Sequence, residues 1–231
     1  MGDKQYRRED RLLPQTNELV ASSVQATDAD GAAVALLTNN ARARDLLCAT
    51  DAVAARIDEL QFTIGSGPCL EAFMHERPVT VADLADVAAV VRWPMFASEV
   101  LGELAVHAVH ALPIVTGGAR LGVLELYRHT PGPLSDSSFR AAQSVAEQLG
   151  TVVLGELENY HGSPRDHGSP IPQGRHVWAR EDISTAIGMT AVRLGVPAED
   201  ASAWLRARAY AHSCSISSLS RDIIDGRCSP D

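Results

Sequence analysis

Cysteine is scarce in this chain of 231 residues, and the four that occur are Cys48, Cys69, Cys214 and Cys228. They form no CxxC pair, and they lie too far apart in the sequence to predict a zinc cluster. Four cysteines in a chain of this length indicate free thiols rather than a disulfide framework. The sequence therefore argues against the small disulfide-stabilised and zinc-finger classes of protein.

Long apolar runs are also missing. No run approaches the roughly 18 apolar residues that a membrane helix needs. The first ten residues are polar and charged, unlike a secretory signal. We therefore expect a cytoplasmic protein with no membrane partner.

Motifs of known catalytic sites are absent as well. The sequence has no glycine-rich phosphate loop, no His/Cys metal spacing and no nucleophile elbow. His107 and His110 lie three residues apart on one predicted strand, so they point to opposite faces and cannot bind one metal together. For either histidine, a haem ligand and an ordinary hydrogen-bonded sheet residue both remain open. We predict no catalytic residue, no metal site, no identifiable cofactor and no enzyme activity.

Positive charge is in short supply, since the net charge is −9. From residue 176 onward six arginines face seven Asp and Glu, so this part is nearly neutral. Residues 1–175 carry almost all of the excess negative charge. A nucleic-acid-binding protein usually shows a basic footprint, and this sequence has no strong one.

What the sequence does contain is a set of three short helical patterns between residues 180 and 225. Apolar residues recur there at the three-and-four spacing of a helical face. Gly195 suits the end of the first helix, Pro197 the start of the second and Ser215 the cap of the third. Helices this short must pack on one another, so residues 177–226 predict a small all-α domain.

The same segment carries a family resemblance in four stretches: Ile183–Met189, Leu194–Ala201, Leu205-Arg206 and Ala209–His212. In order and spacing they resemble an ANTAR domain, the three-helix RNA-binding module of bacterial antitermination regulators. The resemblance implies that RNA hairpins in nascent transcripts are the partners.

Four arginines are the candidate RNA-binding residues, because arginine pairs with phosphate and stacks on unpaired bases. They are Arg193, Arg206, Arg208 and Arg221. For each of them an ordinary surface arginine is the alternative. Arg208 falls within the apolar stripe of its helix, so it could instead be a half-buried ion-pair partner.

Residues 18–159 predict an α+β domain with an antiparallel sheet and flanking helices. Gly117-Gly118 is a strong signal for a hairpin between two apolar runs. The predicted elements are hairpins over 31–50 and 106–128, a short strand over 78–82, and helices over 18–26, 51–60, 68–76, 94–104 and 136–159, the last capped by Ser135.

This domain also carries a family resemblance. Its motifs are Gly65-x-Gly67-Pro68-Cys69-Leu70-Glu71-Ala72, Arg77-Pro78-Val79, Leu112-Pro113-Ile114 and Leu121–Leu124. They resemble a GAF domain, of the subgroup that precedes ANTAR modules in actinobacterial proteins. The resemblance implies a small-molecule or redox sensor, with a ligand that the sequence does not identify.

Cys69 is the candidate sensor residue. It follows Gly67-Pro68 and would lie in the first turn of a helix, where the helix dipole favours a thiolate. This position suits a redox switch or a contact in a sensor pocket. The alternative is that Cys69 packs as a small hydrophobic residue, as buried free cysteines usually do.

The predicted layout is a mobile tail (1–17), a GAF-like sensor domain (18–159), a Pro/Gly-rich linker (160–176), an ANTAR-like domain (177–226) and a short tail (227–231). The hypothesis is an RNA-binding antitermination regulator controlled by its sensor domain, as a homodimer paired through the helix over 135–159. The alternative is a small-molecule or redox sensor whose C-terminal helices serve dimerisation or protein docking.

Overall fold

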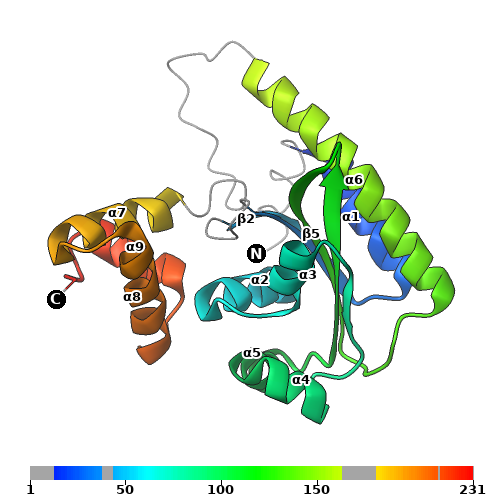
Figure 1. Ribbon diagram of the computed structural model, residues 1–231, viewed down its shortest axis with the longest axis horizontal. Helices are drawn as coiled ribbons and strands as arrows, with labels where there is room; N and C mark the ends of the chain where they lie inside the picture. Colours follow the sequence, from blue (N-terminus) through cyan, green and yellow to red (C-terminus); the bar gives the residue numbers. More distant parts are fainter. Residues whose placement is uncertain (1–12, 38–43, 163–180, 213, 231) are drawn as a thin grey trace, which may run out of the picture.

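The structure is a computed structural model that describes residues 13–37, 44–162, 181–212 and 214–230. Much of the predicted tail and linker therefore lies outside the described residues. The described elements form an antiparallel sheet with helices on both faces, followed by three further helices (Figure 1).

The five strands form one antiparallel sheet in the order β2-β1-β5-β4-β3. Both predicted hairpins are confirmed, and Gly117 and Gly118 take positive φ angles of 55° and 78° in the turn between β4 and β5. The strands are β1 (Gly31–Leu37), β2 (Arg44–Ala49), β3 (Val79–Val81), β4 (Ala108–Thr116) and β5 (Ala119–Arg128).

One face of the sheet is covered by α1 (Pro14–Thr27) and α6 (Asp136–Gly162), which lie side by side in Figure 1. Ser135 caps α6 as predicted, because its Oγ accepts the N–H of Ser138 at 3.1 Å. The apolar stripe of α6 packs on its own sheet and on α1. Leu154 points away from that core and is 37 % exposed.

The predicted ends of two helices in this domain need correction. Helix α1 begins at Pro14 instead of residue 18, because a carboxylate far along the chain caps it. Glu156 of α6 accepts the N–H groups of Gln15 and Thr16 and the Thr16 hydroxyl, at 2.8, 3.1 and 2.6 Å. Helix α6 also continues to Gly162, three residues beyond its predicted end.

The opposite face carries α2 (Ala52–Ile64), α3 (Pro68–His75), α4 (Val87–Arg92) and α5 (Pro94–Glu99). The Asp51 side chain caps α2 by accepting the N–H of Ala54 at 2.8 Å. The helix predicted to run to Leu104 instead becomes a π-helical turn over Val100–Leu104. Helix α4 was not predicted, because its exposed valines give no amphipathic pattern.

The three C-terminal helices are confirmed as α7 (Glu181–Leu194), α8 (Ala198–Ala211) and α9 (Ile216–Ile224). Gly195 has a φ of 65°, and Ser215 caps α9 by accepting the N–H of Ser218 at 3.0 Å. Their apolar stripes meet in a small core that also takes one side chain from α2. We call this set the C-terminal core; its buried members are Phe62, Ile183, Ala186, Leu205, Ala209, Ile216, Leu219 and Ile223.

Candidate functional site

The turn between α2 and α3 positions Cys69. Gly65 ends α2 with a φ of 74°, and Pro68 is the first residue of α3. Gly67 has a φ of 152°, and a Cβ there would come within 2.8 Å of the Gln61 side chain. Glycine is therefore required at 67 both by the backbone conformation and by the close approach of Gln61. Cys69 follows as the second residue of α3, and its side chain is fully buried.

Gln61 connects this turn to the sheet. Its Oε1 accepts the backbone N–H of Cys69 at 2.8 Å, and its Nε2 donates to Oε2 of Glu125 at 2.6 Å. Both Gln61 and Glu125 are buried. The amide thus links the start of α3 to β5 through two hydrogen bonds that are shielded from water.

A buried ion pair completes the site. Nε of Arg44 donates to Oδ1 of Asp58 at 2.7 Å, and both side chains are at most 2 % exposed. Burial alone would lower the pKa of Arg44, but the charges of Asp58, Cys69 and Glu125 raise it above its usual value. We call Arg44, Asp58, Gln61, Cys69 and Glu125 the buried polar cluster. The ion pair and the hydrogen bonds offset the cost of burying these groups away from water.

Glu125 is the member of the cluster whose charge can change near neutral pH. Burial raises its pKa to about 7, against the opposing effects of the Arg44 charge and the Gln61 hydrogen bond. Perturbed carboxylates of this kind concentrate at functional sites. A proton gained or lost at Glu125 therefore changes the charge next to the Gln61 amide, to which Glu125 is hydrogen-bonded.

The structure leaves both interpretations of Cys69 in place. Its burial fits a packed hydrophobic residue, whereas its position at the start of α3 beside Arg44 fits a stabilised thiolate. Within the described ranges, no group of three or more His, Cys, Asp or Glu could hold a metal ion.

The two histidines proposed for the sheet lie in different surroundings. His107 lies just before β4 and is partly exposed, with its Nδ1 3.0 Å from Oδ1 of Asp83. His110 is fully buried on β4, and neither ring nitrogen has a hydrogen-bond partner among the described residues. The described residues therefore do not show His110 as an ordinary hydrogen-bonded sheet residue, which was one of the two alternatives. Burial and the nearby charge of Arg128 lower its pKa to about 4, so it is neutral.

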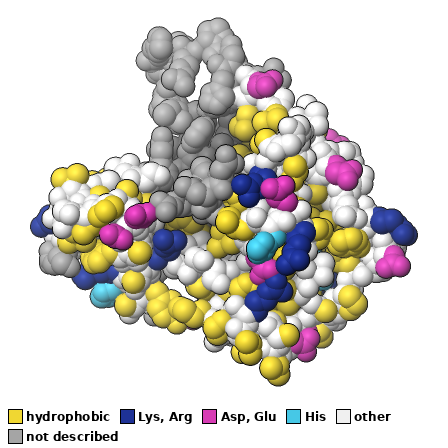
Figure 2. Space-filling model, in the orientation of Figure 1, with side chains coloured by type: hydrophobic (Ala, Val, Ile, Leu, Met, Phe, Trp, Pro, Cys, Tyr) yellow, Lys and Arg dark blue, Asp and Glu magenta, His cyan; other side chains and the backbone are white. Residues whose placement is uncertain are grey.

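The four candidate RNA-binding arginines do not gather at one point. Arg193 is exposed on α7, and Arg221 is exposed on α9 with its Nε 3.8 Å from a carboxylate oxygen of Asp182. Arg206 and Arg208 are both half-buried on α8. Figure 2 likewise shows dark blue side chains at separate places over the C-terminal helices, among yellow and magenta ones.

Arg208 and Arg206 have different neighbours. The guanidinium carbon of Arg208 lies 5.2 Å from the centre of the Trp204 ring, close enough for a cation–π contact. Arg206 instead faces α2, where its Nη1 lies 3.4 Å from the position of a Cβ at Gly65.

Most of the buried polar cluster escapes sequence reasoning. Glu125 stands between two leucines on a strand, a pattern typical of an outward-facing side chain on a half-exposed sheet. Helices cover both faces of this sheet, so the carboxylate is buried instead. Asp58 and Gln61, three residues apart, read from the sequence as part of a solvent-facing side of the helix, so they gave no sign of burial either.

The fold is of the α+β class. It has one antiparallel sheet, a helix pair on one face, and further helices on the other face that cover the buried polar cluster. The sequence model of the GAF domain matches residues 11–153. The chain therefore belongs to the GAF domain family. No curated protein matches the chain.

Two solved structures share this fold at low sequence identity. The GAF domain of a phosphoenolpyruvate-protein phosphotransferase from Coxiella burnetii has a TM-score of 0.51 and 16 % identity, over 68 % of this chain and 93 % of that one. A domain of a protein described as a two-component sensor histidine kinase from Sinorhizobium meliloti 1021 has a TM-score of 0.50 and 19 % identity, over 64 % of this chain and 94 % of that one. At these identities the likeness shows the fold alone. No helix within the described ranges is long and apolar enough to cross a membrane.

Proposed function

We propose that this chain is a cytoplasmic regulator in which the GAF domain senses a small molecule or a redox change and the C-terminal helices bind RNA. Binding to hairpins in a nascent transcript would prevent a terminator from forming, with no chemical step by the protein. The observation that carries the proposal is that the four stretches that resemble an ANTAR domain fall along α7, α8 and the turn between them, and that these helices pack with α9 in the C-terminal core. Their contact with α2 gives the sensor a direct route to them.

The chemistry of RNA recognition favours arginine at exposed or half-exposed positions. Arg193 and Arg206 fit this role best, because Arg221 has an acidic neighbour and Arg208 stacks on Trp204. With so few cations the module should bind weakly as one copy, and its affinity should depend only moderately on salt. A homodimer would offset this by presenting two modules together.

The test is a titration of the full-length protein with an RNA that carries two short hairpins, at low salt, with and without reductant. We expect binding that favours two linked hairpins over single hairpins at twice the concentration. Arg193→Ala and Arg206→Ala should each weaken binding, whereas Arg140→Ala, an exposed arginine on α6, should not. The RNA function fails if no binding occurs in either redox state.

A second candidate function is supported by the surface of α7. Met189 and Val192, one helical turn apart, are 43 % and 86 % exposed, so α7 presents an apolar strip to solvent. Such a strip suits dimerisation or docking of a protein partner by the C-terminal helices. In that case Val192→Asp should reduce the mass measured by light scattering from dimer to monomer, and RNA should have no effect on it.

A further inference from the structure

Helix α2 belongs to two packed regions at once. On one side, Asp58 and Gln61 form part of the buried polar cluster of the GAF domain. On the other side, Phe62 is buried in the C-terminal core and is only 8 % exposed. Asp58, Gln61 and Phe62 lie within little more than one helical turn of α2. A movement of this end of α2 therefore displaces both the buried polar cluster and the anchor of the C-terminal core.

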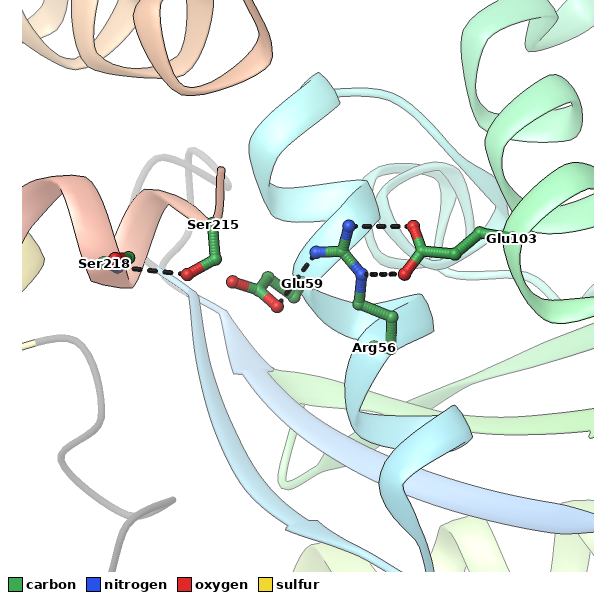
Figure 3. A network of polar contacts seen from close by, with 5 residues as sticks. All are labelled: Arg56, Glu59, Glu103, Ser215 and Ser218. Carbon is green, nitrogen blue, oxygen red and sulfur yellow. Dashed lines mark hydrogen bonds and ion pairs between the residues drawn. The ribbon is translucent and has the colours of Figure 1, made fainter. Parts of the chain in front are cut away.

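Among the described residues, the contact between the two units is narrow. Phe62 is the one buried residue that the GAF domain gives to the C-terminal core within the described part of the chain. Figure 1 shows the end of α2 against α8, and Figure 3 shows Glu59 of α2 oriented toward Ser215, the cap of α9. A buried aromatic side chain is the usual anchor of such a contact, with polar groups around it contributing little.

Arg206 is half-buried beside this anchor, next to Gly65. Among the described residues it makes no hydrogen bond or ion pair, and burial lowers its pKa. A guanidinium held against a glycine without a counter-ion is poorly accommodated in a permanent interface. An anionic ligand would satisfy it, but only after α8 moves away from α2.

We propose that α2 is an autoinhibitory clamp: Phe62 holds the C-terminal helices on the GAF domain and keeps Arg206 covered, so that RNA binds tightly only after this contact opens. This inference rests on the proposed RNA function and adds how that function is controlled. A change in the buried polar cluster that moves Gln61 would shift Phe62 on the same helix and favour the open arrangement.

The experiment compares four full-length proteins: the unaltered chain, Phe62→Ser, Phe62→Ser with Arg206→Ala, and Val91→Ser. Val91 is an exposed apolar residue on α4 outside the C-terminal core, so its substitution controls for the loss of an apolar side chain. Small-angle scattering measures whether the molecule opens, and titration with the two-hairpin RNA measures binding.

We expect Phe62→Ser to increase the radius of gyration and to tighten RNA binding by about tenfold or more, within the usual range of coupling between sites. The added Arg206→Ala should remove the gain in affinity but leave the molecule open. Val91→Ser should match the unaltered chain in both measurements.

Three other results would overturn the clamp, each for a different reason. If Phe62→Ser stays compact, Phe62 is not the anchor. If Phe62→Ser opens but binds RNA no more tightly than the unaltered chain, covering Arg206 does not limit RNA affinity, although the protein still binds RNA. If it opens and neither protein binds RNA, the proposed function fails, and the contact is only a structural brace.

Discussion

Replacing Glu125 by glutamine tests the electrostatics of the buried polar cluster through the pH dependence of unfolding. The substitution keeps the shape of the side chain, and its amide oxygen can still accept the hydrogen bond from Gln61. It removes only the ability to ionise. The comparison therefore isolates the cost of placing a carboxylate at this buried position.

Whether stability rises or falls with pH follows from the direction in which folding shifts the pKa of Glu125. The pKa of Glu125 is about 7 in the folded protein, whereas an unfolded glutamate has a pKa of about 4.5. Below pH 4.5 the residue is protonated in both states, and the fold has its full stability. As the pH rises toward 7 only the unfolded state loses the proton, so stability is lost across this window. The difference in pKa corresponds to about 3 kcal/mol.

The assay is urea unfolding followed by circular dichroism at several pH values between 4.5 and 8. The free energy of unfolding of Glu125→Gln, minus that of the unaltered chain, should rise by about 3 kcal/mol over this range. Glu147→Gln, at an exposed site on α6, should give a flat difference. Parallel curves for Glu125→Gln and the unaltered chain would show that the carboxylate stays ionised in the fold, and the reasoning would be wrong.

Three further predictions concern other parts of the chain. Glu156→Ala should lower the free energy of unfolding by about 2 kcal/mol, because it leaves the first turn of α1 without its acceptor, whereas exposed Glu158→Ala on the same helix should have little effect; equal melting temperatures would contradict this. The pKa of His110 is about 4 in the folded protein, so the free energy of unfolding should fall by about 3 kcal/mol as the pH drops from about 6.5 to 4. His110→Leu should remove this loss in acid unfolding curves, and an unchanged acid slope would refute the prediction. In native alkylation followed by mass spectrometry, Cys69 should react before Cys48, because burial raises the pKa of Cys48 to about 12 and the start of α3 favours a thiolate at Cys69; equal labelling would support the packed-hydrophobe interpretation.

Local signals explain what could be predicted from the sequence. Gly117-Gly118 specifies a tight hairpin, and Ser135 and Ser215 specify helix starts, because each acts within three or four residues of itself. The strands and the three C-terminal helices follow from such signals. Their order along the chain then determines which elements can be neighbours.

Contacts between distant segments could not be predicted in this way. The cap that Glu156 provides to α1 joins residues about 140 positions apart, so nothing near Pro14 indicates that the helix begins there. The burial of Glu125 could not be predicted for a related reason, since it depends on helices covering the second face of the sheet. In both cases the determining partner is fixed by tertiary packing and leaves no periodic pattern.

Phe62 lies outside the apolar stripe of its helix, and this position indicates a contact with another part of the chain without identifying that part. Val53, Ile57 and Leu60 form an apolar stripe along α2, and they pack within the GAF domain. Phe62 lies off that stripe, and on an isolated domain a large aromatic side chain there would be exposed. In the structure the C-terminal core covers it, so the off-stripe position is satisfied by another part of the chain. An apolar residue on the polar side of a helix therefore indicates a partner, although the sequence alone does not identify which one.

The position of Phe62 also bears on how a signal could travel. Gln61 is hydrogen-bonded to both Glu125 and the backbone of Cys69, and its neighbour in the chain anchors the C-terminal helices. A change at the buried polar cluster could thus reach the C-terminal core through the backbone of one rigid helix. Coupling of this kind needs a packed element with two discrete arrangements. The contact between α2 and α8 offers two, because Phe62 anchors it while Arg206, which has no ion-pair partner among the described residues, lies half-buried against Gly65. Under the proposed function, the physical route from sensor to output is the end of α2, whichever ligand or redox change acts on the cluster.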